Sequence, residues 1–184
     1  MSVFSLFGKK RLSEEHIAKV FVSTINGLAI DTFPILRDYL MDVPELACPP
    51  KIKENQMEWF LYIVFSANLY NLRTAFQGDQ HDRMRILIID EFIASLEGKS
   101  EDAVLEQINN YEDYIAALDR RENDGLGKII ALAIFNKYGL NDCQVEHFQK
   151  MNMANPIIIK AMMEITENFI WNWNDILENY KLVA

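Results

Sequence analysis

The feature that most constrains this chain is an uninterrupted run of seven apolar residues, WFLYIVF, at positions 59–65. A helix that is apolar on every side is stable only where other elements surround it. A fully buried strand would show the same run, but helical spacing continues through Leu69, Leu72 and Phe76. We therefore predict a buried central helix near residues 54–76.

Helical spacing of apolar residues extends over most of the chain, which predicts an all-α fold. No alternating apolar and polar run is bounded by turn residues, so strands are not expected. Ser13 suits the N-cap of a first helix that breaks at Gly27, and a short second helix begins near Asp31. Asn155 caps a long C-terminal helix near residues 156–181, with Pro156 at its first position. We expect a compact array of about seven helices.

A chain of 184 residues without a long linker fits one domain. We predict a single helical domain over residues 13–184, preceded by a flexible N-terminal segment, residues 1–12. Cys48 and Cys143 stand 95 positions apart, which predicts buried free thiols in a reducing cytoplasm. No apolar run approaches the roughly 18 residues of a membrane span, so no span is expected.

The negative charge of the chain is concentrated in one segment. The net charge is −9, and residues 90–124 hold eleven acids and three bases. The remaining residues are close to neutral. A nucleic-acid binder needs a basic surface to displace counterions from phosphate, so nucleic acid is not an expected partner.

An acidic helix is predicted within this segment. Ser100 caps it, and its apolar residues alternate steps of four and three: Val104, Ile108, Tyr111, Ile115 and Leu118. This narrow seam takes the buried side. The candidate interaction residues are the acids expected on the exposed faces: Glu101, Asp102, Glu106, Glu112 and Asp113.

No motif predicts catalysis, a metal or a cofactor. The histidines His16, His81 and His147 form neither a Glu-x-x-His nor a His-x-x-x-His spacing. The segment GLGK at residues 125–128 lacks the earlier glycine and the following Ser or Thr of a phosphate-binding loop. We name no catalytic residue, no metal ligand and no cofactor.

Two functional hypotheses follow. The first is a cytoplasmic, non-catalytic interaction protein, such as a bacterial inhibitor, immunity-type protein or adaptor. Its acidic helix would steer a basic protein partner, unless those acids form only a solvated face. The second is a small-molecule binder or helical enzyme with a pocket near Tyr62, Asn68, Asn71 and Arg73, where polar residues follow the apolar run. The oligomeric state is not predicted.

Overall fold

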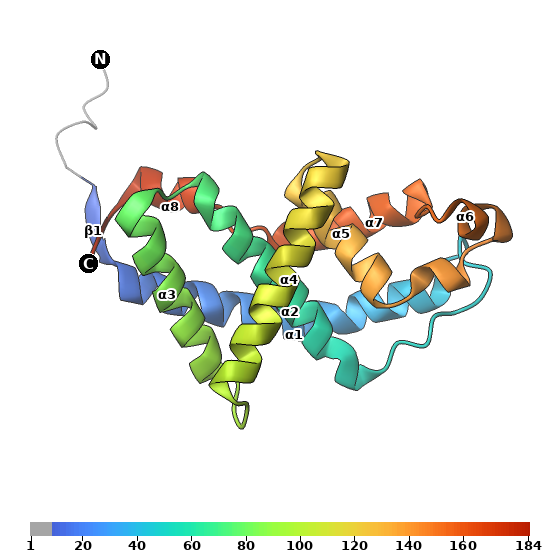
Figure 1. Ribbon diagram of the computed structural model, residues 1–184, viewed down its shortest axis with the longest axis horizontal. Coiled ribbons are helices and arrows are strands. Elements are labelled where there is room, and N and C mark those ends of the chain that lie inside the picture. Colours follow the sequence, from blue (N-terminus) through green and yellow to red (C-terminus); the bar gives the residue numbers. More distant parts are fainter. Residues whose placement is uncertain (1–8) are drawn as a thin grey trace, which may run out of the picture.

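The computed structural model describes residues 9–184, and helices account for most of them (Figure 1). The predicted all-α array is confirmed. The α-helices are α1 (Glu14–Asp42), α2 (Met57–Asn71), α3 (Gly78–Ser95), α4 (Glu101–Glu122), α5 (Leu126–Lys137), α6 (Glu146–Met151), α7 (Pro156–Thr166) and α8 (Trp173–Asn179). Short 3-10 turns are η2 (Glu54–Gln56), η3 (Leu72–Thr74), η4 (Leu140–Cys143) and η5 (Glu167–Phe169).

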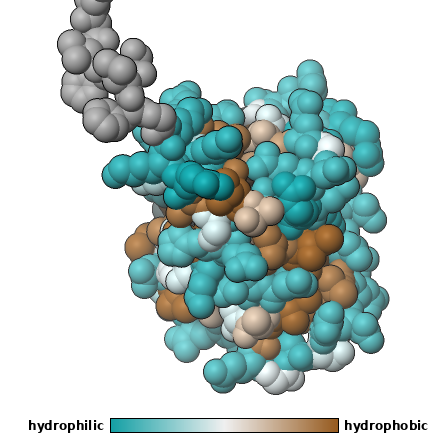
Figure 2. Space-filling view, turned by 90° about the vertical axis from the view of Figure 1, so that its left-hand side faces the viewer, coloured by the Kyte–Doolittle hydropathy of each residue, from teal (hydrophilic) through white to brown (hydrophobic). Residues whose placement is uncertain are grey.

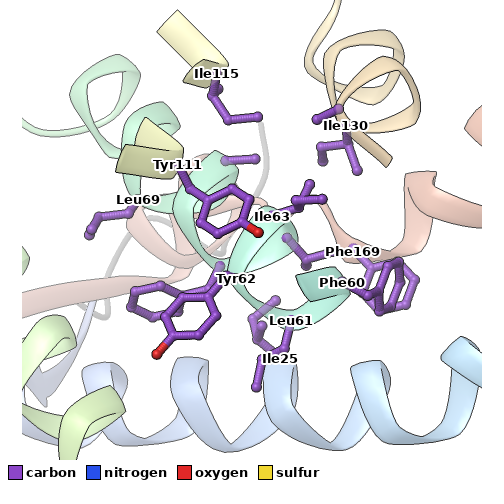
Figure 3. Close-up of a cluster of buried hydrophobic side chains, with 14 of the residues drawn as sticks. Ile25, Phe60, Leu61, Tyr62, Ile63, Leu69, Tyr111, Ile115, Ile130 and Phe169 are labelled. Atoms are coloured by element: carbon purple, nitrogen blue, oxygen red, sulfur yellow. The ribbon is translucent and has the colours of Figure 1, made fainter. Parts of the chain in front are cut away.

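The central helix is α2, which lies between α1 and α4 and also packs against α5 (Figures 1 and 3). Every residue from position 60 to position 69 is buried. Phe60, Ile63 and Val64 are 0% exposed, as predicted. The Phe60 ring meets the Phe169 ring edge to face, with 5.2 Å between centroids. The apolar run therefore forms the middle of the core.

The expected break in the first helix is wrong, because α1 continues through Gly27 and Pro34. Its buried face, which includes Ile25 and Leu36, packs on both α2 and α3. Gly27 and Pro34 both lie on the exposed side. The backbone carbonyl that a helical proline leaves without a donor can face water there, so packing outweighs the weak helix propensity.

Among residues 9–184, α1 is the one helix that is long and apolar enough to cross a membrane by length and composition alone. Part of the apolar content of α1 comes from its buried face, which includes Ile17, Phe21 and Leu40. A core helix meets the same criterion.

The predicted long C-terminal helix is also wrong, because the chain leaves the helix after Thr166 and begins another only at Trp173. The buried Asn68 side chain satisfies the backbone at the break. Its Nδ2 donates to the Phe169 carbonyl at 2.7 Å, and its Oδ1 accepts from the Trp171 amide at 2.8 Å. Hydrogen bonds from a side chain to the backbone can take the place of the hydrogen bonds of a helix. Trp173 is buried and Trp171 half-buried.

The last residues of the segment predicted to be flexible, residues 1–12, belong to a strand. Residues 1–8 lie outside the described part of the chain, but Lys10–Ser13 form strand β1. This strand pairs in parallel with β2 (Tyr180–Val183), in the register Lys10↔Tyr180. The surface at this end of the molecule is mostly hydrophilic, with hydrophobic residues in small groups (Figure 2). Strands this short show no alternating pattern, so no sequence signal predicts them.

Candidate functional site

The predicted buried seam of α4 is confirmed. All five of its residues are buried: Val104, Ile108, Tyr111, Ile115 and Leu118. Through this seam α4 packs across α2, and the Tyr111 ring stacks on the Tyr62 ring with an interplanar angle of 6° (Figure 3). The seam therefore fixes which side of α4 faces solvent.

Three carboxylates lie on the side of α4 opposite the seam. Asp102, Glu106 and Asp113 fall within roughly 40° around the helix axis and extend over about 16 Å along it. All three are exposed, as predicted, and none forms a salt bridge with the described residues. We call these three residues the acidic stripe. Glu101 is exposed beside it in the first turn, where the helix dipole favours acids.

The predicted exposure of Glu112 is wrong. Its side chain is only 17% exposed, and Arg85 of α3 donates to both carboxylate oxygens, at 3.0 and 2.7 Å. Burial raises the pKa of Glu112, and the Arg85 hydrogen bonds oppose that rise. This carboxylate is used inside the fold, where it joins α4 to α3, and it is not available to a partner.

Charge reversal at Glu112 should therefore affect stability more than charge reversal in the acidic stripe. We expect Glu112→Lys to lower the free energy of unfolding by about 2 kcal/mol, because it places two cations together in a partly buried site. Glu106→Lys should change it by less than about 0.5 kcal/mol, as for most surface substitutions. Urea denaturation of the two variants measures the difference, and equal losses would contradict these assignments.

The acids at the C-terminal end of α4 and just beyond it are paired with cations. Asp119 accepts from the Tyr70 hydroxyl at 2.8 Å and from Arg73 at 3.3 Å. Lys128 pairs with Glu122 at 3.5 Å and with Asp124 at 2.9 Å. The uncompensated charge of α4 therefore lies toward its N-terminal end, between Glu101 and Asp113.

The four residues of the predicted pocket lie in different surroundings. Asn68 is buried and bonded to backbone, and Tyr62 is enclosed by aromatic rings, where burial raises its pKa to about 12. Arg73 is exposed and lies over the Tyr70 ring. Asn71 is half-buried at the end of α2. The five best-formed cavities among residues 9–184 have none of the four in their lining.

The structure does contain a cleft that the sequence does not predict. It has a volume of about 610 Å³ and lies between the end of α4, α5 and the start of α7. Its apolar lining includes Leu132, Phe135 and Met163, and Lys128 and Lys160 lie among its polar residues. The size is typical of small-molecule sites. Its lining comes from separate helices, so no single motif marks it.

Within residues 9–184, no group of three or more His, Cys, Asp or Glu side chains is arranged to hold a metal ion. Comparison with protein-family models, curated proteins and solved structures finds no match.

Proposed function

We propose that this protein is a non-catalytic interaction module, such as an inhibitor, immunity-type protein or adaptor, that attracts a basic protein partner through the acidic stripe. The observation that carries the proposal is the uncompensated charge of Asp102, Glu106 and Asp113, presented side by side on a helix whose opposite face is locked into the core. A fixed row of like charges directs an approaching partner, because its field is already oriented before contact.

The spacing of the stripe supports steering at long range. Asp102 and Glu106, at positions i and i+4, repel each other, and of the three residues only Asp102 lies in the first turn, where the helix dipole favours an acid. Helix stability therefore does not explain the presence of Glu106 and Asp113. The Debye length is about 30 Å at 0.01 M salt, which exceeds the roughly 16 Å length of the stripe. At low salt the three charges therefore act on a partner together.

Affinity capture from native lysate tests the proposal with three baits. The first is the wild-type chain, and the second is the stripe variant Glu106→Lys/Asp113→Lys. The third is a control, Glu164→Lys/Glu178→Lys, which changes the net charge equally at exposed positions of α7 and α8. We expect a basic protein to be enriched by the wild type and the control but not by the stripe variant. The same proteins captured by all three baits would contradict the proposal.

A further inference from the structure

The two cysteines, 95 positions apart in the sequence, lie side by side in the fold. Leu46 and Gln144 form an isolated antiparallel bridge, which brings the loop between α1 and η2 against the end of η4. The amide of Ala47 donates to the carbonyl of Cys143 at 2.7 Å, and the amide of Cys48 approaches the same oxygen at 3.4 Å.

These contacts bring the two backbones close enough for a disulfide to be within reach. Standard bond lengths place the Cα atoms of Cys48 and Cys143 within about 7 Å of each other when their backbone atoms approach this closely. Disulfides form at Cα separations of about 4.4–6.8 Å. The thiols also interact: burial raises the pKa of Cys143 to about 11, and the Cys48 thiol adds to the rise.

The Cys143 side of the pair is held firmly. Gln144 is 0% exposed, its Nε2 donates to the Met153 carbonyl at 3.0 Å, and its Oε1 accepts from the Asn155 amide at 2.6 Å. This network fixes the backbone next to Cys143. On the other side, Cys48 is exposed. The predicted burial of both thiols is therefore wrong, because Cys48 is open to reagents and Cys143 is half-buried.

We propose that Cys48 and Cys143 form a redox-sensitive dithiol, which a small disulfide such as oxidised glutathione converts into an intramolecular disulfide. The Cys48 thiolate attacks one glutathione sulfur, and the other glutathione leaves as a thiolate. Cys143 then loses its proton to solvent and attacks the Cys48 sulfur, releasing the second glutathione. The two protein thiols together lose two electrons and two protons, and one glutathione disulfide is reduced to two thiols.

The order of attack follows from the surroundings of each thiol. Cys48 is the accessible group, so it meets the reagent first. Cys143 is a thiol at neutral pH, because burial raises its pKa, and only a small fraction is the reactive thiolate. Burial still raises the pKa of Cys143 once Cys48 carries glutathione, so the second step should be the slower one. Its rate should rise about tenfold for each pH unit below the pKa of Cys143.

The closed disulfide would tie the loop between α1 and η2 to the connection between α5 and α6. Cross-linking residues this far apart in sequence stabilises a domain by restricting the unfolded chain. We expect the oxidised protein to melt about 10 °C higher than the reduced one. The inference does not rest on the acidic stripe, so either proposal can fail without the other.

The test uses the full, reduced chain incubated with oxidised glutathione, followed by intact mass and peptide mapping. We expect the wild type to lose two hydrogens and retain no glutathione, Cys143→Ser to stop at the glutathione adduct on Cys48, and Cys48→Ser to react slowly. Three outcomes would overturn the proposal: separate glutathione adducts on both cysteines, disulfide-linked dimers, or an internal disulfide that lowers the melting temperature.

Discussion

Truncation of Phe60 to alanine is expected to lower the free energy of unfolding by about 3–5 kcal/mol, the range for a well-packed buried aromatic. The side chain is 0% exposed, and its ring centroid lies 5.2 Å from that of Phe169 and 5.9 Å from that of Phe33. Collapse around the cavity is restricted, because the neighbouring rings belong to different elements. The loss is a large share of the roughly 5–15 kcal/mol that stabilises a typical domain.

Urea denaturation measures the effect, with Ile35→Ala as the matched control. Ile35 is an apolar residue of α1 that is 61% exposed, so its truncation should cost less than about 0.5 kcal/mol. A loss below about 1 kcal/mol for Phe60→Ala would show that α2 does not lie at the centre of the core.

Replacement of Asn68 by alanine is expected to cost about 3 kcal/mol. The Asn68 side chain makes three hydrogen bonds. It donates to the Val64 and Phe169 carbonyls and accepts from the Trp171 amide. Without it, backbone groups at the break between η5 and α8 lose their partners in a site with little access to water. Each buried group left unsatisfied costs about 1–3 kcal/mol.

Asn71→Ala is the control for this variant, because Asn71 is a half-buried asparagine of the same helix whose side chain makes no hydrogen bond with the described residues. Urea denaturation compares the two variants, and hydrogen exchange at the Trp171 amide reports the local effect. We expect faster exchange in Asn68→Ala only. Equal stability and unchanged exchange would mean that Asn68 does not hold the break.

The sequence predicts those parts of the fold that depend on periodicity within one helix. The run at residues 59–65 places α2 in the core, and the alternating steps from Val104 to Leu118 orient α4. Capping is also local: Ser13 accepts from the His16 amide at 3.2 Å, and Asn155 accepts from the Ile157 amide at 2.9 Å. These features need no knowledge of distant residues.

The features that the sequence does not predict depend on contacts between distant segments. The break after α7 depends on Asn68, about a hundred positions earlier in the chain, and the pairing of β1 with β2 joins the two ends of the described chain. The exposure predicted on α4 is confirmed for Glu101, Asp102, Glu106 and Asp113. It is wrong for Glu112, because its partner Arg85 lies on another helix. Cys48 and Cys143 are brought together by loops, whose paths no periodicity reveals.

The most direct test of the proposed function is the association rate with the captured basic partner, measured by stopped flow at about 0.01 M and about 1 M salt, where the Debye length falls from about 30 Å to about 3 Å. We predict that the wild type and the control Glu164→Lys/Glu178→Lys associate at least tenfold faster at low salt than at high salt. The stripe variant Glu106→Lys/Asp113→Lys should associate more slowly at low salt and show a flatter salt dependence. Identical rates for the wild type and the stripe variant at both salt concentrations would contradict steering and leave the stripe as a solvated helix face.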